Sequence, residues 1–417
     1  MPSDDSQPDC IHRTTCRVCG GSAFEPVLTL GPSPLANSFL RSPQEFPDER
    51  CFPLDLYLCT QCSLLQLLDV VNPDLLFRHY LYVTGTSSTM AEHNREYAQT
   101  VSGLLDLKRG DLVAEVASND GSLLRCFQAH GVDTLGIEPA RNLAAAASAA
   151  GIETVNEFFT RAVARELRRR RTPRAIAANN VLAHVDDPVD FLGGCRDLVS
   201  DDGLVTIEVP YVGELLNRLE YDTVYHEHLS YFSIAALLKL CDRVGLAAVR
   251  IDRLPVHGGS LRLYLSRSAA GHADDVRRLE DAERREGIAD VARYRRFADD
   301  VRASRTALVA LLEDLRAAGR RVAGYGAPAK GNTLLNYCSI DTRLLAYTVD
   351  KNPLKVGLYT PGMHIPVRDV SVLSGGEDPD YLLILAWNFA DEIVRQQQQY
   401  AARGGRFIVP VPTPQVM

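Results

Sequence analysis

The chain has 417 residues, 46% of them hydrophobic and 24% charged, values that are ordinary for a soluble globular protein. This length exceeds what one hydrophobic core usually serves, so we expect two or three domains. The net charge of −8 argues against a general nucleic-acid binder. No apolar run approaches the roughly 18 residues of a membrane span, and the N-terminus shows no signal-peptide core, so we expect a cytoplasmic protein.

Two cysteine pairs stand near the N-terminus, Cys16-Arg-Val-Cys19 and Cys59-Thr-Gln-Cys62. Paired CxxC knuckles supply four thiolates at the spacing that tetrahedral zinc requires. Four thiolates leave no open coordination position, so we predict a structural Zn²⁺ in a zinc-binding lobe over residues 13–74. Free cysteines are the alternative interpretation.

Hydroxyl-bearing residues then precede an expected helix from Met90 to Leu105. Tyr82 and Ser88 could face a ligand at the N-terminus of this helix. On pattern alone, plain capping of the helix is the better interpretation.

The hydrophobic pattern of the sequence changes at residue 111. A buried strand, Leu112–Ala117, leads through a turn to a helix and to a second strand that ends in Glu138-Pro139. In a Rossmann-like fold such a turn approaches a nucleoside by its backbone, and the acid holds the ribose hydroxyls. The turn has only Gly121 where a dinucleotide site requires GxGxxG. With Glu115 in the strand, this pattern favours S-adenosylmethionine, which has no pyrophosphate; a plain α/β turn is the alternative.

Further strands are expected at residues 152–155, 175–178 and 203–211, which places polar side chains at their carboxyl ends, where open α/β sheets bind ligands. The predicted cofactor residues are Glu115, Ser118, Asn119, Asp120, Gly121, Glu138, Pro139, Asn156, Phe158 and Asn180, together with Tyr82 and Ser88.

The run Tyr225-His226-Glu227-His228 follows the last of these strand ends. So many polar groups are costly to bury without partners, whereas histidine beside a carboxylate suits acid–base chemistry near neutral pH. An idle polar loop is the alternative. Because the run could fold back over the ligand crevice, we predict a functional cluster.

A helix at 234–244 and a strand at 247–251 complete a middle domain over residues 75–252. Charged residues of both signs alternate over 270–319, which indicates a solvated helical connector.

A second α/β unit is expected within residues 253–417. A strand enters Gly324-Tyr325-Gly326, a helix is expected from Thr333 to Cys338, and the next strand ends in Asp350. The loop amides and Lys330, one of five lysines in the chain, could hold a pyrophosphate. Pure architecture is the alternative for this weak GxGxxxK pattern.

Taken together, the motifs resemble the S-adenosylmethionine-dependent sugar C-methyltransferases of deoxysugar (antibiotic) biosynthesis, which act on nucleotide-linked 4-keto-6-deoxyhexoses. The resemblance covers nearly the whole chain. Its motifs are the four cysteines, Tyr80–Met90, Glu115–Gly121, Glu208–Tyr211, Tyr225–His228, Leu254–Gly259, Gly324–Gly326 with Lys330, and Thr360–Pro366. Two positions depart from the family pattern: Ala117 stands where glycine is usual, and His226 lies at a variable position.

The resemblance implies a zinc lobe, a Rossmann-like S-adenosylmethionine domain and a C-terminal Rossmann-like α/β domain that helps to hold a thymidine diphosphate (dTDP) sugar. It implies that His228 is the base, with Tyr225 and Glu227 beside it, in a monomer. The residues assigned to the substrate are His184, Tyr211, His257, Tyr325, Lys330, Asn332 and His364.

The chemistry follows from first principles. A 4-keto group acidifies the proton on the adjacent C3 (the favoured position) or C5, and a base of near-neutral pKa removes it. Tyr225 would stabilise the enolate, Glu227 would orient an imidazole, and the carbanion would attack the methyl sulfonium.

Three rival functions stay open. An NAD-dependent nucleotide-sugar oxidoreductase or epimerase would require GxGxxG or a Tyr-xxx-Lys pair. A metallohydrolase of the HExxH type would require histidine at the position of Ser230. A non-enzymatic zinc scaffold would leave the run Tyr225–His228 unexplained.

Overall fold

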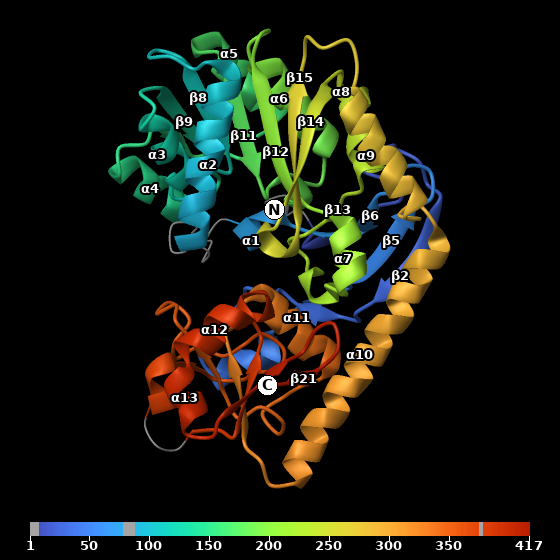
Figure 1. Cartoon of the computed structure of the whole chain (residues 1–417), viewed down its shortest axis with the longest axis vertical. Coiled ribbons are helices and arrows are strands. Elements are labelled where there is room, and N and C mark those ends of the chain that lie inside the picture. Colours follow the sequence, from blue (N-terminus) through green and yellow to red (C-terminus); the bar gives the residue numbers. More distant parts are fainter. Residues whose placement is uncertain (1–7, 78–87, 375–377) are drawn as a thin grey trace, which may run out of the picture.

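The computed structural model describes residues 8–77, 88–374 and 378–417. It has three parts (Figure 1): a small N-terminal lobe, a middle α/β domain and a C-terminal α/β domain. Helix α10 (Val291–Ala317) runs along one side from the middle domain to the C-terminal domain. Its 27 residues give a rod of about 40 Å.

The N-terminal lobe consists of short antiparallel strands: β1 (Cys10–His12), β2 (Phe24–Thr29), β3 (Ser33–Pro34), β4 (Cys51–Phe52), β5 (Asp55–Cys59), β6 (Leu65–Leu67) and β7 (Asp69–Val71), with the 3₁₀ helix η1 (Pro43–Asp48) and helix α1 (Pro73–Phe77). Its main sheet has the order β13-β6-β5-β2. The edge strand β13 (Ser230–Tyr231) comes from the middle domain, where it begins two residues after His228. The lobe is therefore joined by backbone pairing to the predicted catalytic run.

The middle domain is built on a seven-stranded sheet of order β10-β9-β8-β11-β12-β15-β14. The first five strands, β10 (Thr154–Val155), β9 (Asp133–Ile137), β8 (Leu112–Val116), β11 (Ala175–Asn179) and β12 (Leu204–Pro210), are parallel; β15 (Ser260–Ser266) is antiparallel to β12 and to β14 (Ala247–Leu254). Strand β8 is buried throughout, as expected of a parallel strand that is covered on both faces. Strand order reverses between β8 and β11, which marks the ligand crevice of such sheets.

The helices of this domain are α2 (Ser88–Leu105), α3 (Ser122–Gln128), α4 (Arg141–Ala149), α5 (Arg161–Arg170), α6 (Pro188–Leu198), α7 (Val212–Arg218), α8 (Ile234–Val244) and α9 (Asp274–Arg285), with 3₁₀ turns η3 (Leu182–His184), η4 (Tyr221–Thr223) and η5 (Val256–Gly258). Helix α8 has the predicted bounds. Its N-cap Ser233 accepts from the Ala236 amide, and Gly245 ends it in the left-handed region.

The C-terminal domain repeats the pattern with the order β18-β17-β16-β19-β20-β21. Strands β18 (Val367–Asp369), β17 (Thr348–Asp350), β16 (Val322–Tyr325), β19 (Tyr381–Ile384) and β20 (Arg406–Val409) are parallel, and β21 (Gln415–Val416) is antiparallel; α11 (Ala329–Cys338), α12 (Ala390–Gln396), α13 (Gln398–Ala402), η6 (Val370–Ser374) and η7 (Trp387–Phe389) complete it.

The predicted fold class is confirmed: a four-cysteine lobe, a central methyltransferase-like sheet and a C-terminal parallel sheet. The boundary predicted at residue 252 differs from the structure, because β15 at 260–266 inserts between β12 and β14 of the middle sheet. The turn at 255–259 hides this strand in the sequence. Helix α11 also begins at Ala329, four residues before the predicted start, after its N-cap Pro328.

Candidate active site

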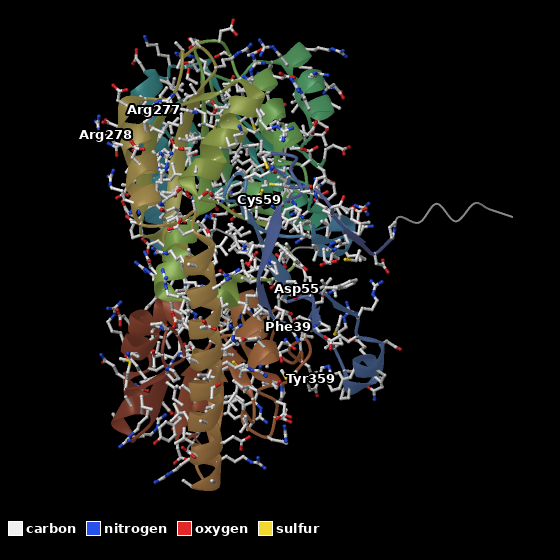
Figure 2. All side chains as sticks on the ribbon, turned by 90° about the vertical axis from the view of Figure 1, so that its right-hand side faces the viewer. Phe39, Asp55, Cys59, Arg277, Arg278 and Tyr359 are labelled. Atoms are coloured by element: carbon white, nitrogen blue, oxygen red, sulfur yellow. The ribbon has the colours of Figure 1, made fainter. Side chains whose placement is uncertain are left out.

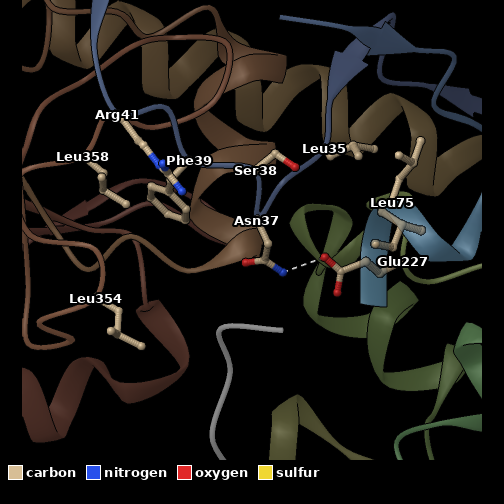
Figure 3. A pocket seen from close by; sticks show the side chains of 10 residues that line it. Leu35, Asn37, Ser38, Phe39, Arg41, Leu75, Glu227, Leu354 and Leu358 are labelled. Carbon is tan, nitrogen blue, oxygen red and sulfur yellow. Dashed lines mark hydrogen bonds between the residues drawn. The ribbon is translucent and has the colours of Figure 1, made fainter. Parts of the chain in front are cut away.

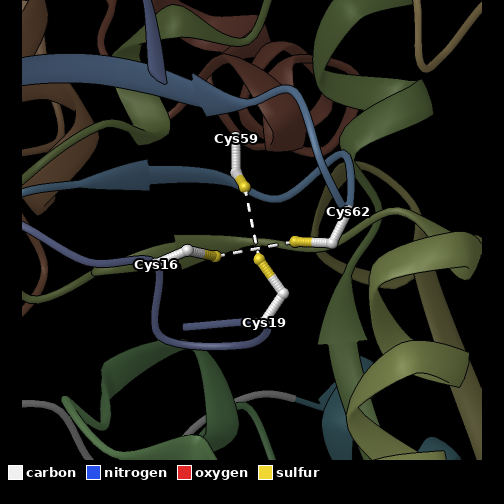
Figure 4. A group of neighbouring side chains, drawn as sticks. All are labelled: Cys16, Cys19, Cys59 and Cys62. Carbon is white, nitrogen blue, oxygen red and sulfur yellow. Dashed lines mark hydrogen bonds between the residues drawn. The ribbon is translucent and has the colours of Figure 1, made fainter. Parts of the chain in front are cut away.

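The four cysteine sulfurs lie together in the N-terminal lobe (Figure 4), all within 4.8 Å of one another. The Sγ atoms of Cys16 and Cys62 are 3.5 Å apart, as are those of Cys19 and Cys59. Tetrahedral zinc with Zn–S bonds of about 2.3 Å holds its sulfurs about 3.8 Å apart, so the set fits the ion. Gln66 Nε2 donates to Cys16 Sγ, an outer-shell contact of the kind that orients a metal ligand.

Residues within and just before the first cysteine pair attach the lobe to the middle domain. Arg17 Nε donates to Asp186 Oδ1 at 3.2 Å, and Arg13 Nη1 donates to Asp186 Oδ2 at 2.9 Å. Burial lowers the pKa of Arg17 to about 10, although Asp186 opposes the shift. Arg243 of α8 donates to the carbonyl of Val18. The first cysteine pair is thus anchored to Asp186, which lies two residues after His184.

His228 is held from two sides. Its Nδ1 faces the carbonyl of Thr223 at 2.9 Å, and its Nε2 faces the hydroxyl of Tyr225 at 3.0 Å. A carbonyl only accepts, so Nδ1 carries the proton, and Nε2 accepts from Tyr225. In this tautomer Nε2 is the basic atom of His228, and it accepts a hydrogen bond from the Tyr225 hydroxyl.

His184 lies against His228, with the two ring centroids 4.8 Å apart and nearly perpendicular. Burial lowers the pKa of His184 to about 4, so this imidazole is neutral near neutral pH. The amide of Leu229 donates to the carbonyl of Ala183 at 2.8 Å. The structure thus brings His184, Tyr225 and His228 together, and a neutral His184 adds no positive charge that would weaken a neighbouring base.

His226 faces the N-terminal lobe. It is 1% exposed, and Nε2 donates to the carbonyls of Phe52 and Pro53, both at 3.2 Å. Burial lowers its pKa. It fastens β4 to the run Tyr225–His228.

Glu227 is 2% exposed, and its Oε1 accepts from Asn37 Nδ2 at 2.6 Å. It lines a cavity of about 490 Å³ to which all three parts of the chain contribute (Figure 3). The other lining residues are Leu35, Asn37, Ser38, Phe39, Arg41, Leu75, Leu76, Leu354 and Leu358. Sequence reasoning missed Asn37, which lies 190 positions away from Glu227.

The predicted cofactor turn lies at the switch point of the middle sheet. Glu138 Oε2 accepts from the Asn119 amide and its Oε1 from the Ala140 amide, both at 2.8 Å. Asn156 Nδ2 donates to the Glu138 carbonyl at 2.7 Å. Asn119 (φ 51°), Gly121 (φ 73°), Asn180 (φ 53°) and Ala117 (φ 57°) adopt the left-handed region, which glycine adopts with the least strain.

Two buried polar atoms of this crevice, Glu115 Oε2 and Ser118 Oγ, have no hydrogen-bond partner among the described residues. Burial raises the pKa of Glu115 well above its usual value, and Glu138 and Asp120 raise it further. Asp120 accepts from the amide and the hydroxyl of Ser122. An acidic, under-satisfied crevice fits a ligand with amino and sulfonium groups and does not suit a pyrophosphate. Pro139 and Phe158 flank Glu138 and Asn156 in sequence and are half-buried.

Several residues assigned to the substrate are occupied elsewhere. Tyr211 is buried under the Arg253 guanidinium, 5.2 Å from its ring, and burial raises the pKa of Tyr211. The Tyr325 hydroxyl accepts from Gln397 at 3.2 Å, within the core of the C-terminal domain. The structure therefore does not bring these two phenols to the His228 cluster.

Three further substrate assignments mediate contacts within the protein. Asn332 Nδ2 donates to the Ala36 carbonyl at 2.8 Å. The His364 ring stacks on Phe46 at 3.8 Å and its Nε2 contacts Glu49 at 2.8 Å. Lys330 Nζ lies 4.8 Å from the centre of the Trp387 ring.

The remaining assignments fall where the structure is silent. Tyr82 lies outside the described residues. Ser88 begins helix α2 and His257 lies in η5, and the structure describes neither side chain.

Comparison with known proteins follows the same three parts. A putative zinc binding domain matches residues 16–77, a methyltransferase domain matches 90–251, and the C-methyltransferase C-terminal domain matches 255–412. The C-methyltransferase NovU of Streptomyces niveus is 38% identical over 405 residues, 96% of either chain. The chain belongs to the C-methyltransferase family.

Among solved structures, magnesium protoporphyrin IX methyltransferase (ChlM) of Synechocystis PCC 6803 with bound SAM matches at 14% identity and a TM-score of 0.33, covering 43% of this chain and 82% of that one. The 1,6-didemethyltoxoflavin-N1-methyltransferase of Burkholderia thailandensis matches at 17% identity and a TM-score of 0.31, covering 41% and 76%.

The family assignment confirms the predicted enzyme class, a C-methyltransferase that uses S-adenosylmethionine, and the predicted zinc lobe. Among the helices that the structure describes, none in this C-methyltransferase has the length and apolar character to cross a membrane.

Proposed function

We propose that this C-methyltransferase methylates the carbon next to the keto group of a dTDP-4-keto-6-deoxyhexose, in the biosynthesis of an unusual deoxysugar. The observation that carries the proposal is His228, whose Nε2 is kept unprotonated by the Nδ1–Thr223 bond and lies 3.0 Å from the Tyr225 hydroxyl. C3 is the favoured position and C5 is the alternative.

His228 Nε2 takes the proton from the acidified carbon and becomes an imidazolium that Thr223 continues to hold through Nδ1. The Tyr225 hydroxyl, released from Nε2, turns to the oxygen of the enolate. S-adenosylmethionine supplies the methyl group, whose bond to sulfur breaks as the bond to carbon forms. The neutral His184 beside His228 keeps the base from facing a second cation.

The acidic first turn supports this donor. Burial, with Glu138 and Asp120 nearby, raises the pKa of Glu115 in the crevice, and carboxylates there attract the positively charged groups of S-adenosylmethionine. The same carboxylates would repel the pyrophosphate of NAD. This disfavours NAD in the middle domain; the alternative, an NAD-dependent nucleotide-sugar oxidoreductase or epimerase, would place NAD in the C-terminal unit. We also propose that the enzyme acts as a monomer in the cytoplasm.

Deuterium exchange tests the proposal. The enzyme is incubated in D₂O with dTDP-4-keto-6-deoxyhexoses, with and without S-adenosylmethionine, and the substrate is followed by proton NMR. Exchange at C3, followed by methylation there, is expected; exchange at C5 selects the alternative. If no 4-keto sugar exchanges a proton or gains a methyl group, the proposed substrate class is wrong.

A further inference from the structure

The chain contains one tryptophan, and it joins two domains. Trp387 begins η7, just beyond β19 of the C-terminal domain. Its Nε1 donates to Asp222 Oδ2 at 2.6 Å. Asp222 belongs to η4 of the middle domain and is 0% exposed. A neutral indole donor from one domain thus meets a fully buried carboxyl of another.

The surroundings make this contact important for Asp222. Burial raises the pKa of Asp222, while the charge of Lys330 and the Trp387 hydrogen bond lower it. Lys330 in turn lies over the Trp387 ring at 4.8 Å. Nearby Glu220 is also buried, with its pKa raised to about 7. Both charge-compensating groups come from the C-terminal domain, and removing one partner of a buried carboxylate is costly.

Asp222 is followed directly by the residue that holds the base. The Thr223 carbonyl accepts from His228 Nδ1 at 2.9 Å and from the Tyr231 hydroxyl at 3.3 Å. The C-terminal helix α11 packs on the same turn, where the rings of Tyr221 and Tyr337 are 5.5 Å apart. The C-terminal domain therefore packs against η4, the turn whose Thr223 carbonyl fixes the His228 tautomer.

We propose that Trp387 and Asp222 are positioning residues, through which the C-terminal domain sets the place of the Thr223 carbonyl and hence the aim of His228 Nε2. The consequence for rate rests on the proposed function; the consequence for His228 does not. The C-terminal domain thereby acts on the chemistry of the middle domain as well as on binding.

The test is Trp387→Phe, which keeps an aromatic ring under Lys330 and removes the N–H donor. We expect the turnover number for deuterium exchange to fall about 10- to 100-fold, because small misplacements of a catalytic group are costly. The KM for the dTDP sugar and the affinity for S-adenosylhomocysteine should stay within about twofold. Asp222→Asn, which keeps an oxygen for the indole, should lose less than Trp387→Phe.

Tyr400→Phe is the matched control, since it removes a hydroxyl that donates to the Arg406 carbonyl within the same domain and not to the middle domain. It should leave exchange unchanged. If Trp387→Phe slows exchange no more than Tyr400→Phe, or lowers only substrate affinity, the positioning role is wrong.

A second readout does not depend on the substrate. In protein labelled with ¹⁵N-histidine, the His228 ring signals are assigned by their loss in His228→Asn. Trp387→Phe should shift them away from the Nδ1–H tautomer, and Tyr400→Phe should not. Unchanged His228 signals in folded Trp387→Phe overturn the inference. Should Trp387→Phe not fold, the same comparison is made in Asp222→Ala, which removes the carboxyl that accepts from the indole and must therefore move these signals if the inference is right.

Discussion

The two Rossmann-like units of this chain share an architecture, and even a detail that suggests a ligand. In the middle domain Glu138, at the end of the second strand, accepts from the amides of Asn119 and Ala140. In the C-terminal domain Asp350, at the corresponding place, accepts from the amides of Ala327 and Asn352 at 2.7 and 2.8 Å. The acid braces the first turn in both units, so it does not by itself identify a nucleoside site.

The difference lies in what surrounds the turn. The middle unit carries Glu115 in its first strand and leaves Glu115 and Ser118 atoms without partners among the described residues. The C-terminal unit has Gly324 in that strand, and Lys355 Nζ donates to the Ala327 carbonyl at 2.8 Å. The C-terminal unit also leaves such an atom, Asn332 Oδ1, so the acidic lining distinguishes the middle crevice, and fold alone does not make a site.

The crevice of the C-terminal unit is also covered from outside. Segment 36–40 of the zinc lobe lies against it: Ala36 accepts from Asn332, Phe39 lies 5.1 Å from Lys355 Nζ, and Leu40 pairs with Tyr359. Figure 2 shows Phe39 and Tyr359 in this region between the lobe and the C-terminal domain. The same segment also lines the cavity beside Glu227, together with Leu354 and Leu358 of the C-terminal unit.

The largest expected effect comes from the middle domain, which carries the predicted base. His228→Asn should lower methyl transfer and deuterium exchange about 10²- to 10⁴-fold, the range for loss of a general base, with S-adenosylhomocysteine affinity unchanged. Exposed His12, bonded to Asp69, offers the matched variant His12→Asn, which should retain full activity. Near-normal turnover in His228→Asn would exclude it as the base.

Loss of zinc should affect the first turn of the C-terminal unit more than that of the middle unit. Cys59→Ser removes one of four ligands, and metal analysis should fall from one zinc per chain to well below one. Hydrogen exchange should then rise in the turn at 326–332, which segment 36–40 covers, while the affinity for S-adenosylhomocysteine falls less than about threefold. Exposed Cys51 is not a ligand, so Cys51→Ser should keep the metal. An equal rise of hydrogen exchange in the first turns of both units would contradict this prediction.

Glu115 should distinguish the crevices by charge. Glu115→Gln should weaken S-adenosylmethionine binding about tenfold, since it removes a buried charge that pairs with a cation. Asp350→Asn, a matched change in the other unit, should leave this affinity unaltered. Isothermal titration calorimetry measures both; equal losses would remove the basis for assigning the cofactor to the middle unit.

The raised pKa of Glu115 predicts proton linkage. In the free enzyme the raised pKa means that the carboxyl keeps its proton to a higher pH than an ordinary glutamic acid does. A bound cation favours the ionised carboxylate, so binding of the cofactor releases a proton. Affinity for S-adenosylmethionine should therefore increase with pH until the free carboxyl is ionised. Calorimetry in two buffers of different ionisation enthalpy detects the proton, and Glu115→Gln should abolish the release.

The smallest effects concern the two first turns themselves. Ala117 adopts φ 57° and Gly326 adopts φ 90°, a region that costs a residue with Cβ about 1–2 kcal/mol. Ala117→Gly should raise the free energy of unfolding by about 0.5–1 kcal/mol, and Gly326→Ala should lower it by more than that, since its Cβ would meet the Ala386 Cβ at 3.2 Å. Denaturant titration measures both, and changes of the same sign would refute the argument.

Local patterns predicted much of the fold. Buried runs such as Leu112–Val116, ended by turn residues, gave the parallel strands of both units, and the spacing of four cysteines gave the zinc site. Strand β15 was assigned to the C-terminal unit because Pro255 and two glycines with positive φ separate it from its hairpin partner. Its sequence therefore reads as the beginning of a new domain.

Contacts between domains could not be predicted in this way. Asn37 meets Glu227 and Trp387 meets Asp222 across 190 and 165 positions, and hydrophobic periodicity does not say which surfaces will meet. Lys330 illustrates the same limit. Its scarcity and glycine-rich surroundings suggested a phosphate ligand, but its position over Trp387 depends on a neighbour 57 positions later that the pattern did not connect to it.

The placement of the zinc lobe has a consequence for biosynthesis. The lobe leaves the ribosome first, yet Leu40 pairs with Tyr359, and Glu49 accepts from the Gly362 amide. The sheet of the lobe is also incomplete until β13, at residues 230–231, has been synthesised. A nascent chain must therefore carry its earliest segment with apolar surface uncovered until nearly nine-tenths of the sequence has been translated. Early capture of the metal would keep that segment folded while it waits for its last partners.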